Sequence, residues 1–180
     1  GMLTAVVLHP PRFGARVKSF DAGGLKNVPG VRAVLELPTG IAVIANGFWA
    51  AKSGRDALKV EWNENRAWKG STDALMASYR TLAAKPGKVA RSEGDAAAAI
   101  AGAVTRLEAS YEFPYLAHAA MEPMNCVMRL SEGRCEVWNG EQFQTADQTA
   151  VAKVVGMKPE QVSIDTLYAG GSFGRRANPY

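Results

Sequence analysis

The sequence predicts an α/β fold of the α+β kind: a small first domain followed by a partial α+β domain with a mixed sheet. Short runs of β-branched and aliphatic residues bounded by Gly and Pro indicate strands. Segments whose apolar residues recur every three or four positions indicate helices. In the last third a helical segment stands between strand-like segments, which favours a sheet covered by helices.

The first third is predicted as strand, loop, two strands, helix and strand. The apolar run 2–10 stops at consecutive prolines, and the runs 31–37 and 41–45 are punctuated by Pro and Gly. Gly30, in a turn before the second run, is free to adopt a positive φ. Residues 48–62 begin with helical spacing and end in strand-like alternation. These elements predict one small α/β unit.

The middle of the chain is predicted to be helical. Residues 63–71 are polar and indicate a boundary, after which Ser71 or Thr72 can cap a helix that runs to about Ala84. Asp95 can cap a short alanine-rich helix, although a low-complexity linker is the alternative. Three apolar residues of the longer helix are spaced to form one buried stripe: Leu75, Tyr79 and Leu82.

Beyond Val104 the pattern is typical of β-structure. Over residues 106–113 apolar and polar side chains alternate until Pro114, which predicts a strand. Residues 125–138 predict a hairpin.

A helix and a strand complete the predicted fold. Residues 145–157 predict a helix closed by Gly156, and 161–168 predict a strand that leads directly into a glycine-rich loop.

Composition and charge exclude some functions. The net charge of +4 and the pI near 9.2 come from 21 Lys and Arg against 17 Asp and Glu that are scattered without a basic block, so we expect no nucleic-acid partner. No apolar run reaches the roughly 18 residues of a membrane span, and no export signal is visible. Cys126 and Cys135 lack a C-x-x-C partner or a nearby His cluster, so they are interpreted as core thiols.

The stretch "GGSFGRR" permits two interpretations. As a G-x-S-x-G elbow it would make Ser172 a hydrolase nucleophile, but both histidines, His9 and His118, precede it, so no triad in the order Ser, acid, His can follow. As a backbone loop, its glycines allow a close approach to a ligand, and Arg175 and Arg176 add two cations suited to phosphate.

Two further features carry polar groups that could bind a ligand. His118 and Glu122 stand four positions apart, but two side chains are too few for a metal site, and a hydrogen-bonded turn is favoured. Gln142 follows a predicted turn, where its neutral amide can donate to an oxo or carbonyl oxygen without adding charge.

In order, "HAAMEPMNC", "WNGEQ" and "GGSFGRR" resemble the molybdopterin-binding large subunit of the xanthine dehydrogenase/aldehyde oxidase family, in particular its isoquinoline 1-oxidoreductase beta-subunit type. The first third, with "VPGVRAV" and "GIAVIANGFWAAKSGRDALKVEW", is similar to that family's a/b hammerhead domain. The resemblance covers nearly the whole chain. It implies a hammerhead domain over 1–65, a helical connector over 66–103 and a truncated molybdopterin-binding domain over 104–180.

The resemblance also implies a function. The family consists of oxidoreductases that hydroxylate an N-heterocycle or an aldehyde with oxygen from water. The implied cofactor is molybdopterin in a dinucleotide form, and electrons would pass to the [2Fe–2S] clusters of a small partner subunit. A periplasmic or membrane-associated location is favoured over the cytoplasm.

Site residues follow from the same resemblance. Gln142 matches a glutamine that hydrogen-bonds an oxygen ligand of the molybdenum. Phe173 and Gly174 match a loop beside the metal, Gly171 and Ser172 lead into that loop, and Arg175 flanks it. His118 and Glu122 match an element that we assign to structural support, and no catalytic residue is assigned to this chain.

The sequence departs from the family pattern at two positions. Ser172 replaces the third glycine of the usual Gly-Gly-Gly-Phe-Gly, and Ala177 stands where xanthine-type enzymes have a substrate-binding glutamate, which argues against a purine substrate. The catalytic glutamate is expected beyond Tyr180, so the chain is interpreted as a fragment that is inactive alone. The alternatives are a serine hydrolase built on Ser172 and a non-catalytic assembly domain.

Overall fold

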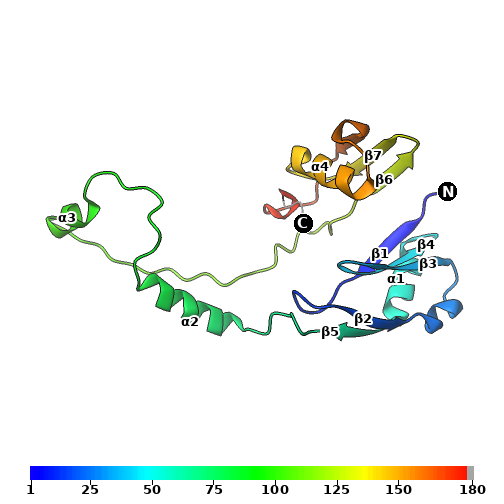
Figure 1. Cartoon of the computed structure of the whole chain (residues 1–180), viewed down its shortest axis with the longest axis horizontal. Helices are drawn as coiled ribbons and strands as arrows, with labels where there is room; N and C mark the ends of the chain where they lie inside the picture. The colour runs from blue at the N-terminus through cyan, green and yellow to red at the C-terminus, as the bar shows by residue number, and fades with distance from the viewer. Residues whose placement is uncertain (178–180) are drawn as a thin grey trace. The chain divides into compact units, whose positions relative to one another are not determined.

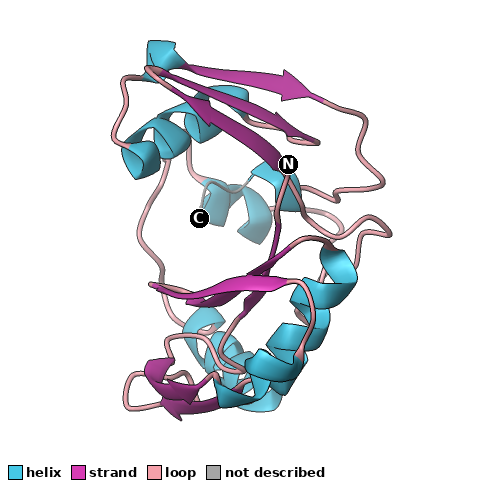
Figure 2. Cartoon of the chain, turned by 90° about the vertical axis from the view of Figure 1, so that its right-hand side faces the viewer, coloured by secondary structure: helices cyan, strands magenta, loops and turns pink. Residues whose placement is uncertain are grey.

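The computed structural model describes residues 1–177, and the chain divides into two compact units. The first comprises residues 1–106, and the second begins at Leu107. Figure 1 shows the order of the elements, from blue at the N-terminus to red near the C-terminus. Helices and strands occur in both units, which confirms the predicted fold class. Figure 2 shows the helices in cyan and the strands in magenta. The three domain ranges stay predictions, and residues 178–180 of the last range lie outside the described residues.

The first unit is built around strand β4 (Gly40–Ala45). This strand pairs antiparallel with β1 (Thr4–Leu8) on one side and with β3 (Val31–Leu37) on the other. Gly30 precedes β3 with a φ of 88°, which confirms the predicted turn. The central position of β4 places its apolar residues in the core: Ile41, Ala42, Val43 and Ala45.

Helix α1 (Phe48–Ala57) packs against β1 and β4 through its smallest residues. Ala51 and Gly54 are the buried residues of this helix. A Cβ atom added to Gly54 would lie 2.9 Å from Val43 Cγ1 and 3.0 Å from Val31 Cγ2. The helix therefore approaches the sheet at a distance that only glycine allows at this position.

A second strand pair joins β2 (Arg16–Asp21) to β5 (Lys59–Asn63). The sequence predicts β5 but not β2. The half-buried residues of β2, Val17 and Phe20, are three positions apart rather than two. The pairing register shifts between Val17 and Ser19. Because such an irregularity breaks the two-residue period, a search for strict alternation does not detect this strand.

The two predicted helices of the middle region are present. Helix α2 (Thr72–Ala83) is capped by the Ser71 hydroxyl, which accepts from the Ala74 N–H, and α3 (Ala96–Ala101) is capped in the same way by Asp95. The predicted buried stripe is wrong, because no residue of α2 is buried and Leu82 is 61% exposed. Spacing shows that a helix could pack, whereas burial also needs a second surface.

The predicted strand over 106–113 is also wrong. Residues 102–126 are all described and contain no helix or strand. Leu107 is 96% exposed and Phe113 is 77% exposed. Alternation favours an extended chain, but a strand exists only when another strand supplies hydrogen bonds.

The second unit contains a mixed sheet, as predicted. Strands β6 (Val127–Ser131) and β7 (Arg134–Asn139) form an antiparallel hairpin, and β8 (Val162–Thr166) pairs with β7 in parallel. Helix α4 (Gln144–Val155) connects β7 to β8 and packs against β8. It ends at Gly156, which adopts the left-handed conformation at a φ of 70°, as predicted. The core of this unit consists of Cys135, Val137, Ala152 and Val162.

The two cysteines differ in their environments. Cys135 is completely buried, and burial raises the pKa of its thiol. Cys126 is exposed, so its assignment to the core is wrong. It precedes β6 by one residue and therefore lies outside the sheet. Among the described helices, none is long and apolar enough to cross a membrane.

We expect Gly54→Ala to destabilise the first unit by about 1–3 kcal/mol, because the added methyl group overpacks the contact between α1 and the sheet. The measurement is amide hydrogen exchange at β4. Gly87→Ala is the matched control, since a Cβ at Gly87 would meet no atom within 4 Å. Equal exchange in the two variants would contradict this account of the packing.

Candidate functional site

The parallel pairing of β7 and β8 brings two loops to one edge of the sheet. Asn139 and Thr166, the last residues of these strands, are register partners, and the Leu167 N–H donates to the Asn139 carbonyl oxygen at 2.8 Å. Loops that follow parallel strands emerge at the same edge, the usual place for ligand sites in such sheets. The segments "WNGEQ" and "GGSFGRR" are therefore neighbours in the folded unit.

A third segment joins them through Glu122. Its N–H donates to the Gly170 carbonyl oxygen at 3.1 Å, and the Gly170 N–H donates to the Glu122 carboxylate at 2.7 Å. The Asn125 side chain donates to the other carboxylate oxygen at 3.0 Å. The Gly170 N–H, then the Asn125 amide and the Arg176 charge, hold the pKa of the Glu122 carboxyl below its ordinary value. The predicted role of Glu122 as structural support is confirmed, whereas His118 is exposed.

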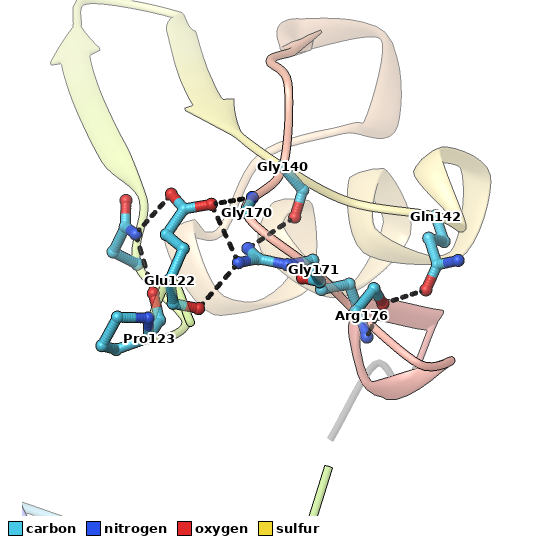
Figure 3. Close-up of polar contacts among 9 residues, drawn as sticks. Glu122, Pro123, Gly140, Gln142, Gly170, Gly171 and Arg176 are labelled. Carbon is cyan, nitrogen blue, oxygen red and sulfur yellow. Dashed lines mark hydrogen bonds and ion pairs between the residues drawn. The ribbon is translucent and has the colours of Figure 1, made fainter. Parts of the chain in front are cut away.

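The side chain of Arg176 connects the three segments (Figure 3). It is 3% exposed, and each of its nitrogens donates. Nε donates to the Gly171 carbonyl oxygen at 2.9 Å, and Nη1 donates to that of Gly140 at 3.0 Å. Nη2 donates at 3.1 Å to both the carbonyl oxygen and the carboxylate of Glu122. The guanidinium group thus joins the three segments at a buried position. We call the place where Glu122, residues 140–142 and residues 170–176 meet the loop junction.

This geometry corrects the expectation of two cations beside the glycine loop. Arg176 is buried and already paired, so its charge cannot serve a ligand. Arg175, the neighbouring residue, is exposed. The two arginines are adjacent in sequence but have separate roles.

Two glycines are required by the close packing of these segments. A Cβ at Gly170 would lie 2.6 Å from Glu122 Cβ, and a Cβ at Gly140 would lie 2.8 Å from Ala169 Cβ. A side chain at either position would push the segments apart. The glycine loop itself turns through positive φ angles at Gly171 (101°), Phe173 (55°) and Gly174 (87°).

Ser172 connects the loop to Gln142. Its hydroxyl donates to the side-chain amide oxygen of Gln142, Oε1, and accepts from the Arg176 backbone N–H at 3.2 Å. Neither partner is a base that could activate a serine nucleophile, so the geometry does not favour the hydrolase elbow. With the Gln142 oxygen engaged, its amide nitrogen has no partner within residues 1–177 and remains a free donor.

The structure contains a buried acid, Glu141, whose burial the sequence does not predict. Glu141 is 7% exposed, and burial, followed by the neighbouring Asp147, raises the pKa of its carboxyl to about 7. A glutamate between a turn and a helix is usually solvated, so no local pattern signals its burial. The burial of Glu141 results from the folding of its loop against α4.

A separate pocket of about 330 Å³ lies beside α4. Apolar residues such as Met128, Val137 and Val151 form its walls, with Asn139 and Asp147 contributing polar atoms. Gln142 and the glycine loop do not line it. The candidate site is therefore the loop junction rather than this cavity. Within the described residues no cluster of three or more His, Cys, Asp or Glu side chains could hold a metal ion.

Residues 82–180 match the family model described as the molybdopterin cofactor-binding domain. Over 99% of its length the chain is 31% identical to isoquinoline 1-oxidoreductase subunit beta of Brevundimonas diminuta, and it covers 24% of that protein. It is 30% identical, over 99% of its length, to a membrane-bound aldehyde dehydrogenase of Gluconacetobacter polyoxogenes, again covering 24% of that protein. The chain thus spans about a quarter of the length of these curated relatives.

Solved structures share this fold. Quinoline 2-oxidoreductase from Pseudomonas putida 86 superposes with a TM-score of 0.68 at 19% identity, over 98% of this chain and 28% of that one. Aldehyde oxidoreductase from Desulfovibrio gigas gives a TM-score of 0.72 at 15% identity, over 98% of this chain and 24% of that one.

Replacing Arg176 by Ala is expected to destabilise the second unit by about 3 kcal/mol, because it leaves the Glu122 carboxylate and the carbonyl groups of Gly140 and Gly171 without their donor. Arg175→Ala should change stability by less than about 0.5 kcal/mol, since this residue is exposed. Amide hydrogen exchange at β7 and β8 measures the stability of the second unit in both variants. Similar losses in the two variants would refute the separate roles of the arginines.

Proposed function

Since the chain belongs to the molybdopterin cofactor-binding domain family, we propose that the loop junction forms part of the cofactor site of a molybdenum hydroxylase. The complete protein would hydroxylate an aldehyde or an N-heterocycle with oxygen from water. Because this chain spans about a quarter of its relatives' length, the activity is proposed for the whole protein. The 180-residue chain alone would be inactive.

One observation carries the proposal: the Gln142 amide and the Gly171–Gly174 loop are held side by side through Ser172. The two come from separate loops, and neither Gln142 nor Phe173 is buried. An exposed amide donor beside an exposed glycine loop is a suitable arrangement for binding an anionic group.

The donor groups present fit such a cofactor. Within residues 1–177 the backbone N–H groups of Gly171, Ser172, Phe173 and Gly174 have no acceptor. Consecutive free N–H groups on a loop with positive φ angles are typical of sites for phosphate and related oxyanions. Arg175 adds an exposed guanidinium group that can bind a phosphate oxygen pair.

When bound, the molybdenum cofactor supplies the oxygen-transfer and two-electron chemistry. The residues of this chain bind and orient it. Gln142 would donate through its amide nitrogen to an oxygen of the cofactor, and the loop N–H groups with Arg175 would hold its anionic part. Arg176 and Glu122 would act indirectly, because they fix the backbone that presents these donors.

Several finer features belong to the same proposal. We expect a dinucleotide form of the pterin, a partner subunit with [2Fe–2S] clusters, and a periplasmic or membrane-associated location. The names of two relatives, a subunit beta and a membrane-bound dehydrogenase, support the last two expectations. Ala177 in place of an acidic side chain supports a non-purine substrate.

In the complete subunit, Gln142→Ala should lower turnover by about 100-fold, as expected for the loss of a donor to developing charge, with molybdenum content retained. The measurements are steady-state turnover and metal analysis of the purified complex. Gln144→Ala is the matched control, because that amide donates to Thr166 instead. Normal turnover with normal molybdenum content in Gln142→Ala would overturn the assignment.

Ser172→Gly should lower turnover only several-fold, because it frees the Gln142 side chain but keeps a residue that fits the loop. The double variant Ser172→Gly, Gln142→Ala should be no slower than Gln142→Ala alone, since the serine acts through that amide. If the losses of turnover in the two single variants add in the double variant, Ser172 has a role that does not depend on Gln142.

A further inference from the structure

Glu141 is a buried acid adjacent to the proposed cofactor ligand. Its side chain is 7% exposed, and neither carboxylate oxygen has a hydrogen-bond partner of good geometry within residues 1–177. The side-chain oxygen of Asn139, two residues earlier, is also buried and unpaired. Unpaired buried oxygens are uncommon, because each loses its hydration without compensation.

The backbone on both sides of Glu141 is fixed. Arg176 donates from Nη1 to the Gly140 carbonyl oxygen at 3.0 Å, and the Gln142 N–H donates to the Arg176 carbonyl oxygen at 3.3 Å. These contacts hold the main chain on either side of Glu141 in the position that places its side chain inside the protein. Its carboxyl group is buried there without a hydrogen-bond partner of good geometry among the described residues.

Burial and Asp147 favour the neutral form of this carboxyl. Asp147, in the first turn of α4, and Asn139, at the end of β7, both interact with it. Asp147 raises the pKa of Glu141 through a hydrogen bond and through its charge, which repels a second carboxylate, whereas the hydrogen bond from the Asn139 side chain lowers it and is the smallest of these effects. The Arg176 guanidinium already donates to Gly140, Gly171 and Glu122, so it is not paired with Glu141. Asp165 of β8 is exposed to solvent. Burial, then Asp147, raises the pKa of Glu141 to about 7.

We propose that Glu141 is a positioning residue for Gln142: its protonated carboxyl donates to Asp147 and ties the loop to the start of α4. A proton shared between the two acids satisfies one of the orphaned oxygens and removes the charge of the buried acid, Glu141. The contact holds the residue that precedes Gln142, while Ser172 holds the Gln142 side chain itself. The use of Gln142 as a cofactor ligand rests on the proposed function, but its positioning does not.

The arrangement makes the loop sensitive to pH. An unfolded glutamate releases its proton near its ordinary pKa of 4.5, whereas the folded protein retains it up to about pH 7. The stability from this proton is fully present below about pH 4.5 and is lost as the pH rises through about 7. Above that pH two carboxylates face each other under the loop.

The test uses the 180-residue chain without cofactor, so its result does not depend on the proposed function. The side-chain amide NMR signals of Gln142 are followed from about pH 5 to about pH 9, and we expect one transition with a midpoint near 7. In Glu141→Gln this transition should disappear, because the amide can donate to Asp147 but cannot ionise. Glu132→Gln, in the exposed turn between β6 and β7, is the control and should keep it.

Asp147→Asn is the second variant. It removes the neighbouring charge but leaves Glu141 buried, so the midpoint should move to lower pH. The unfolding equilibrium constants of the parent chain and of Glu141→Gln are then compared. Their ratio should change by about tenfold or more between about pH 5 and about pH 8.

Three outcomes would overturn the proposal: an absent transition in the parent chain, a transition that persists in Glu141→Gln, or an unchanged midpoint in Asp147→Asn. Failure of Glu141→Gln to fold at any pH would also overturn it, because a neutral side chain of the same shape should replace the protonated acid.

Discussion

The second unit depends on one buried guanidinium group. A charge as buried as that of Arg176 is tolerated only when its donors are satisfied, and here Gly140, Gly171 and Glu122 satisfy them. These acceptors come from three segments that are far apart in the sequence. The need to solvate one arginine therefore fixes the relative positions of all three. It also explains the glycines, because a side chain at Gly140 or Gly170 would keep the segments apart.

This constraint separates two sets of residues at one edge of the sheet. The inner set, Arg176 and Glu122, holds the backbone. The outer set, Gln142 and the Gly171–Gly174 loop, presents an amide nitrogen and successive N–H groups that the described residues leave unpaired. A rigid frame with exposed donors is preorganised, so a bound anion would not have to order the loop. The proposed cofactor role follows from this preorganisation, and Glu141 adds an ionisable support beneath the loop.

Local signals in the sequence predicted much of the fold. The caps Ser71 and Asp95 and the left-handed Gly156 were located correctly because capping involves only neighbouring residues. The hairpin of β6 and β7 followed in the same way. Errors arose where a partner decides the outcome: residues 106–113 alternate but have no strand beside them, and Leu82 has the spacing of a buried residue but is exposed. Strand β2 was missed because its pairing register is irregular.

By itself the sequence determined the fold class, the order of most elements and three short motifs whose succession resembles one family. It named Gln142 and the glycine loop as site residues, which remain part of the proposal. Only the tertiary structure decided that Arg176 is buried and Arg175 exposed, that Ser172 contacts Gln142, and that Glu141 lies inside. The physical reason is that burial and pairing are set by segments distant in the chain. Adjacent residues of similar type can therefore have opposite environments.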